Sequence, residues 1–98
     1  MNSAETIELL RSHTAALRAQ GIAALYLFGS TASDQAGPDS DVDLFVDVDP
    51  AARFSLIELL GVREYLAEIL HRRVDLFSRE GLHRVIRRTV EQSAIRVF

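Results

Sequence analysis

The segment from Asp41 to Asp47 constrains the fold most, because apolar and acidic residues alternate along it. Its apolar positions are Val42, Leu44 and Val46. In an extended strand, successive side chains point to opposite faces. The three apolar side chains are therefore predicted to share a buried face. Asp41, Asp43 and Phe45 then share the other face, where the two carboxylates project side by side.

Apolar runs of other lengths predict the elements around this strand. Two short runs indicate further strands, at 23–28 and at 74–77. Helical spacing of apolar residues indicates helices over 3–18, 55–70 and 82–90 and a short helical turn over 31–35. Asp49-Pro50 suits a helix start, Ser55 and Glu58 form a capping box, and 94–98 is a candidate final strand. This order predicts a single domain over 1–98 of the α/β (α+β) class, with a small mixed sheet of three to four strands packed with helices.

Composition excludes several classes of protein. All eleven basic residues are arginine and there is no cysteine, so lysine-dependent and thiolate chemistry are excluded. A net charge of −3 argues against a dedicated duplex-DNA binder. No apolar stretch approaches the roughly 20 residues of a membrane span, and no leader pattern is present. We therefore expect a soluble, cytoplasmic protein.

The paired carboxylates of Asp41 and Asp43 predict a metal site. Like charges this close repel by roughly 1 to 4 kcal/mol, and a cation would relieve the repulsion. Oxygen ligands suit Mg²⁺ or Mn²⁺, and paired carboxylates suit a two-metal centre. A solvated acidic loop is the alternative. A calcium loop starting at Asp39 is excluded, because its sixth and twelfth positions are Leu44 and Pro50.

The Gly29-Ser30 turn follows the strand at 23–28 and precedes the short helical turn. Glycine lets the backbone approach a phosphate closely, while a hydroxyl and free N–H groups can bind it. An ordinary turn with a helix cap is the alternative interpretation.

Asp75 lies within the apolar run at 74–77, where an unpaired carboxylate costs several kcal/mol in desolvation. A salt bridge to Arg72 or Arg73 is one explanation. If this strand lies next to the strand at 41–47, however, Asp75 joins Asp41 and Asp43 in one acidic site.

The pattern L-F-G-S-x10-D-x-D-L, followed by V-D-L, resembles the DNA polymerase β-like nucleotidyltransferase superfamily, specifically its minimal nucleotidyltransferase (MNT) members. The lead-in Pro38-Asp39-Ser40-Asp41 is similar as well. The resemblance implies that the backbone of Gly29, Ser30 and Thr31 contacts the triphosphate of ATP or another NTP. It also implies that Asp41 and Asp43 ligate two Mg²⁺ ions and that Asp75 joins the catalytic metal.

Small MNT proteins typically pair with a HEPN-domain ribonuclease toxin, and the resemblance implies an antitoxin that transfers AMP to a hydroxyl of that partner in a hetero-oligomer. The alternative is a catalytically weak module that neutralises its partner by contact. Family members often have basic residues after Gly-Ser, whereas Thr31-Ala-Ser-Asp34 follows here. The arginines at 84, 87 and 88 indicate either a solvated helix face or a docking surface. His13, His71 and His83 are predicted to be surface or helix-end residues, and no Arg-x4-6-His signature of a HEPN ribonuclease is present.

Overall fold

The computed structural model describes residues 2–37 and 40–98, so the Pro38-Asp39 part of the predicted lead-in lies outside the described residues. The helices are α1 (Ser3–Arg11), α2 (Thr14–Ala19), α3 (Gly29–Ala32), α4 (Leu56–Leu70) and α5 (Arg84–Ser93), with a 3-10 turn η1 (Arg79–Gly81). The strands are β1 (Ile22–Phe28), β2 (Val42–Val48), β3 (Val74–Ser78) and β4 (Ile95–Arg96). None of the described helices is long and apolar enough to cross a membrane.

The strands form one sheet in the order β3-β2-β1-β4. β1 is antiparallel to β2 and to β4, whereas β2 and β3 are parallel and are connected through α4. A parallel pair needs such a crossover, which α4 supplies. The predicted small mixed sheet is therefore confirmed, including its short final strand.

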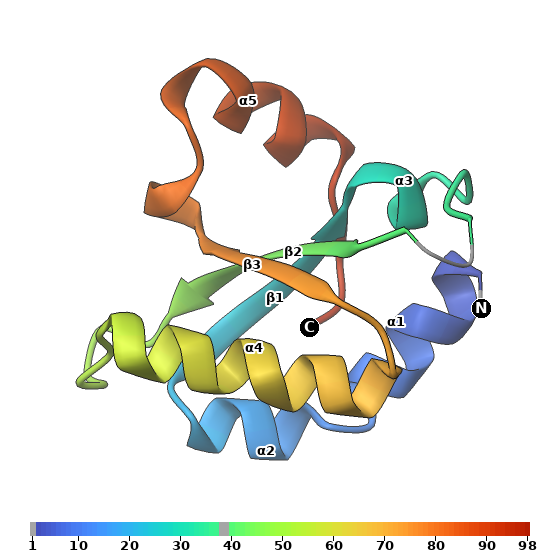
Figure 1. Cartoon of the computed structure of the whole chain (residues 1–98). Helices are drawn as coiled ribbons and strands as arrows, with labels where there is room; N and C mark the ends of the chain where they lie inside the picture. Colours follow the sequence, from blue (N-terminus) through green and yellow to red (C-terminus); the bar gives the residue numbers. More distant parts are fainter. Residues whose placement is uncertain (1, 38–39) are drawn as a thin grey trace.

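Helices cover one face of the sheet (Figure 1), and the other, which we call the open face, is covered less, although Phe45 on it is only 1% exposed. Figure 1 shows α1, α2 and α4 gathered on one side of the sheet, with α5 standing apart on the other side. The covered face holds the predicted apolar residues of β2, which are Val42, Leu44 and Val46, each at most 1% exposed. The opposite side chains of β2 are therefore left on the open face, as the alternation predicted.

The predicted continuous helix over 3–18 is wrong, since α1 ends at Arg11 and α2 begins at Thr14. Hydroxyl groups compete with the helical pattern at this point. Ser12 donates to the carbonyl of Leu9, and Thr14 donates to the carbonyl of Arg11. The break lets α2 turn and pack against β1.

The predicted capping box of Ser55 and Glu58 is confirmed at the start of α4. The helix start expected at Asp49-Pro50 is wrong, because the Asp49 carboxylate accepts a hydrogen bond from the amide of Ala51 and forms a turn instead. The predicted helix over 82–90 is shifted to α5, and none of its residues is buried. Of the apolar residues expected over 82–90, Leu82 is buried just before α5, whereas Val85 and Ile86 are exposed.

Candidate functional site

Asp43 and Asp75 are direct neighbours across the parallel β2–β3 ladder. Adjacent strands lie about 4.8 Å apart, so the two carboxylates start from neighbouring positions. On the other side of Asp43, the antiparallel ladder pairs it with Phe28, the last residue of β1. The predicted adjacency of these strands is thus observed. Asp43 therefore lies between the Gly29 turn and Asp75, and we name Asp41, Asp43 and Asp75 the acidic row.

Gly29 packs directly against Asp43. Its backbone has a φ of +75°, which side chains rarely tolerate. A Cβ atom built on Gly29 would lie 2.3 Å from Oδ2 of Asp43, far inside van der Waals contact. The turn therefore requires glycine twice, for its backbone conformation and for the space that the carboxylate occupies.

Asp41 lies just before β2 and is half-buried. Nε of Arg73 lies 3.1 Å from its Oδ1, yet the geometry forms no hydrogen bond, so this buried oxygen has no hydrogen-bond partner. Arg72 donates instead to the carbonyls of Gly37 and Ser40. Within the described residues Asp75 forms no ion pair with either arginine, which leaves its carboxylate available.

Electrostatic strain is concentrated on Asp43. Burial raises the pKa of Asp43 above its ordinary value, and the neighbouring charges of Asp75 and Asp41 raise it further. A bound cation would oppose all three effects.

The three carboxylates fit a hard divalent cation in their chemistry, since they offer only oxygen donors and one buried Asp41 oxygen accepts no hydrogen bond. Over residues 2–37 and 40–98, however, no three acidic, histidine or cysteine side chains are gathered tightly enough to enclose a metal ion. The donors are thus adjacent without forming a closed cage.

In the turn after Gly29, the side chain of Thr31 is buried and that of Asp34 is exposed. The Thr31 side chain is 2% exposed and its hydroxyl has no hydrogen-bond partner, so only its backbone can face a ligand. Asp34 points away to α1, where its carboxylate accepts hydrogen bonds from the amide of Ser3, 2.7 Å away, and from the Ser3 hydroxyl. Its negative charge thus stabilises the start of α1.

Next to the acidic row, the open face holds an aromatic row. Tyr26, Phe45 and Phe77 are paired across β1, β2 and β3, and the rings of Tyr26 and Phe45 stack at 4.6 Å. Arg79 lies over both rings and forms two hydrogen bonds to Asp47, of 2.7 and 2.9 Å.

Arg79 also bonds to Glu91 of α5, and so ties that helix to the sheet. The hydrogen bonds from Arg79 lower the pKa of Asp47, and the same contacts raise the pKa of Arg79. Sequence analysis did not single out Arg79 or Asp47. Asp47 is four residues after Asp43 and so shares its face, which was the available signal.

The histidines lie at helix ends, as predicted. His13 precedes α2 and its Nδ1 lies 2.9 Å from the Tyr65 hydroxyl, while His71 ends α4 and His83 caps α5. Of the arginines on α5, Arg87 donates to the carbonyl of Glu80.

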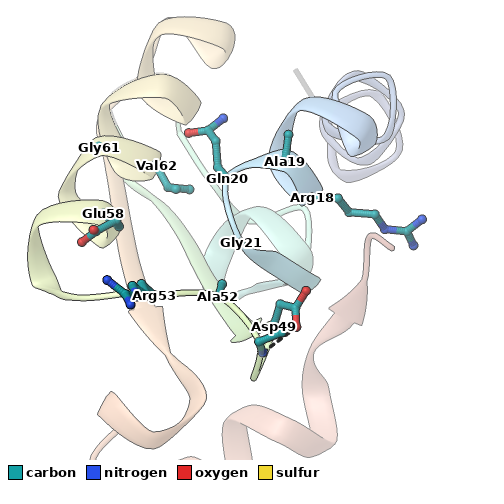
Figure 2. Close-up of a pocket in the computed structure, with 11 residues that line it drawn as sticks. Arg18, Ala19, Gln20, Gly21, Asp49, Ala52, Arg53, Glu58, Gly61 and Val62 are labelled. Atoms are coloured by element: carbon teal, nitrogen blue, oxygen red, sulfur yellow. Dashed lines mark hydrogen bonds between the residues drawn. The ribbon is translucent and has the colours of Figure 1, made fainter.

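A separate hollow of about 580 Å³ surrounds Gly21. Gly21 precedes β1, whereas the acidic row lies at the other end of that strand, roughly 20 Å away at about 3.3 Å per residue. Figure 2 shows Arg18 and Arg53 on opposite sides of this hollow, and Glu58 is held in the α4 cap. Because its polar groups do not converge, it is not part of the candidate site.

Comparison with known proteins identifies the family. The model of the family described as "Nucleotidyltransferase domain" matches residues 10–97. The chain belongs to the nucleotidyltransferase domain family. Among curated relatives, the protein adenylyltransferase MntA of Thermococcus cleftensis is 35% identical over 99% of this chain and 98% of its own length. A nucleoside triphosphate and a divalent cation are the general requirements of a nucleotidyltransferase.

Solved structures share the fold. A protein provisionally named a minimal nucleotidyltransferase is 32% identical, with a TM-score of 0.78 over 97% of this chain and 95% of that one. The MNT antitoxin in complex with a tri-AMPylated HEPN toxin of Shewanella oneidensis is 22% identical, with a TM-score of 0.67 over 94% of this chain and 71% of that one. The latter likeness concerns the fold alone.

Proposed function

We propose that this nucleotidyltransferase transfers AMP from ATP to a hydroxyl of a HEPN-domain partner and thereby acts as its antitoxin. The observation that carries the proposal is the row of Gly29, Asp43 and Asp75, in which a turn suited to phosphate lies against one carboxylate and a second carboxylate lies beyond it. The name of the Thermococcus relative, a protein adenylyltransferase, supports the choice of AMP. The Shewanella complex supports the choice of partner.

In the proposed reaction, the acceptor oxygen forms a bond to the α-phosphorus while the bond to the bridging oxygen of the β-phosphate breaks. Pyrophosphate leaves, and the hydroxyl proton passes to solvent. Two Mg²⁺ ions held by Asp41, Asp43 and Asp75 would neutralise the triphosphate and stabilise the departing pyrophosphate.

The chain's own groups position the reactants. The backbone N–H groups of Gly29, Ser30 and Thr31 and the Ser30 hydroxyl bind the phosphates, since the first amides of a helix have no partner within it. Asp75 orients the acceptor hydroxyl and favours loss of its proton. The Thr31 side chain is buried and so holds the turn against the rest of the domain.

Calorimetry with ATP and Mg²⁺ tests the site. Asp41→Ala should abolish Mg²⁺-dependent binding, whereas Asp49→Ala should leave it intact, because Asp49 is exposed and lies at the other end of β2. Unchanged binding in Asp41→Ala would overturn the assignment.

A second function is favoured by one observation, the absence of basic residues from Thr31 to Asp34. Without them the chain could inhibit its partner by contact alone. Incubating the complex with ATP labelled on the α-phosphate separates the two functions, because only an enzyme labels the HEPN protein. The hydrogen bonds between Asp34 and Ser3 weaken this alternative, since they direct that negative charge toward α1.

A further inference from the structure

The order of Gly29, Asp43 and Asp75 across the sheet determines the side from which an acceptor hydroxyl can approach the nucleotide. This step rests on the proposed function, in which the phosphates lie at Gly29 on the β1 side of Asp43. An in-line displacement needs the attacking oxygen opposite the leaving group. Asp75 lies on the opposite side of Asp43, on β3. The acceptor hydroxyl must therefore approach across β3, which is the terminal strand of the sheet.

β3 runs beside α4 (Figure 1). Residues of these two elements line a groove along the outer edge of β3. It consists of two hollows of about 220 and 610 Å³, which share Asp75 and Arg63. The smaller one is lined mainly by apolar residues of α4 and β3, among them Leu56, Leu60 and Phe77. The larger one extends past Asp75 to Asp41. We name this surface the β3–α4 groove.

The apolar part of the groove is exposed beyond what folding requires. Leu56 is 68%, Leu60 40% and Phe77 38% exposed, although most large apolar side chains of this chain are buried in the core. Such a patch beside polar groups is typical of an interaction site. The outer edge of β3 also offers backbone N–H and C=O groups to an extended segment.

The size and lining of the smaller hollow define its occupant. A volume of about 220 Å³ is below the roughly 300 to 1,000 Å³ of small-molecule sites, so it suits a single inserted side chain. Its lining is mainly apolar, and Arg63 and Asp75 are its charged residues. A side chain with an apolar body and a hydroxyl at its tip matches both features.

We infer that the β3–α4 groove receives the acceptor segment of the partner protein, with an apolar, hydroxyl-tipped side chain lying on Leu56, Leu60 and Phe77 and its hydroxyl directed to Asp75. These three apolar residues are positioning residues. They hold the acceptor and do not touch the nucleotide.

Two neighbouring positions of α4 provide a matched test. Leu56 lines the groove, whereas Ile57 does not and is 79% exposed. Both lie in the first turn of α4, where a negative charge is favourable, so Leu56→Glu and Ile57→Glu should fold equally well. The assay measures transfer of labelled AMP to a purified HEPN-domain partner protein, over a range of HEPN concentrations, with ATP binding measured by calorimetry.

Leu56→Glu should raise the KM for the HEPN protein about tenfold, the effect of roughly 1.4 kcal/mol. It should leave kcat and ATP binding unchanged, and Ile57→Glu should behave as the wild type. If the wild type is active and the two variants have equal kinetics, the groove does not bind the acceptor segment. The proposed transfer of AMP would be unaffected by that result.

If the wild type labels nothing, the transfer function fails, and the groove is judged by calorimetric affinity for the HEPN protein. A lower affinity for the HEPN protein in Leu56→Glu alone then supports binding in the β3–α4 groove. Equal affinities of the two variants contradict it.

Discussion

Replacing Gly29 by alanine should damage stability and the site together, because both depend on one contact. The added methyl group would lie 2.3 Å from Oδ2 of Asp43, and the φ of +75° is itself unfavourable for alanine. The backbone strain costs about 1 to 2 kcal/mol. Overpacking against the carboxylate costs about 1 to 3 kcal/mol more. We therefore expect Gly29→Ala to lower the free energy of unfolding by about 2 to 5 kcal/mol.

Urea denaturation followed by circular dichroism measures this loss, and Gly61→Ala is the matched control. Gly61 lies in the middle of α4, and a Cβ there would meet nothing within 4 Å. Alanine at that position should increase stability by roughly 0.5 to 1 kcal/mol through helix propensity.

A double-mutant cycle separates the two costs of Gly29→Ala. In an Asp43→Ala background the carboxylate is gone, so only the backbone strain of about 1 to 2 kcal/mol should remain. If Gly29→Ala costs the same in both backgrounds, or costs nothing in the wild type, the contact between Gly29 and Asp43 does not have the role assigned to it.

Three other predictions follow from the same contacts. Asp43→Asn should increase the stability of the metal-free protein, because it removes a charge that burial and two like charges disfavour, and should abolish Mg²⁺-dependent ATP binding in calorimetry. Arg79→Ala should lower stability at pH 7 by about 1 to 2 kcal/mol, since it removes a two-bond ion pair and two ring contacts. Because Arg79 lowers the pKa of Asp47 below its ordinary 3.8, this stabilisation is complete above that pH and is lost as the pH falls through the lowered value. The difference between wild type and Arg79→Ala in urea melts should therefore shrink below about pH 4, and a constant difference would contradict the pairing. Asp34→Ala should cost about 1 kcal/mol by removing the acceptor for Ser3 at the start of α1 while leaving ATP affinity unchanged, and a large gain in ATP affinity would show that Asp34 acts on the nucleotide instead.

The features that the sequence predicted well depend on local pattern. The alternation around Asp43 indicated both faces of β2, and Asp75 could be placed beside it because consecutive parallel strands commonly pair. Pairings of distant residues could not be predicted in the same way. The contact of Gly29 with Asp43 depends on strand register, and the bond of Arg79 to Asp47 depends on the path taken by η1. Neither contact produces a periodic pattern in the sequence.

The exposed side chains of α5 illustrate the same limit. Together with Thr89 and Val90, Val85 and Ile86 have the helical spacing typical of a core-facing stripe, yet they are 76% and 49% exposed. Periodicity identifies an amphipathic helix without identifying what covers its apolar face. Here α1, α2 and α4 already cover the other face of the sheet. The helix α5 is held to the open face through the bond between Arg79 and Glu91.

The arrangement of the acidic row favours catalysis over contact alone. The Asp43 carboxylate fills the space beside Gly29, Asp43 is half-buried among like charges, and Asp41 has a buried oxygen without a hydrogen bond. The crowding of like charges around half-buried Asp43 lowers stability, and a domain of this size has only about 5 to 10 kcal/mol in total. A module that neutralises its partner by surface contact needs none of them, because apolar side chains at these positions would fold better. A cation and a triphosphate would relieve the unfavourable interactions of both carboxylates, which explains why they coexist at one end of β2 and why Asp43→Asn should stabilise the free protein while removing its ability to bind ATP.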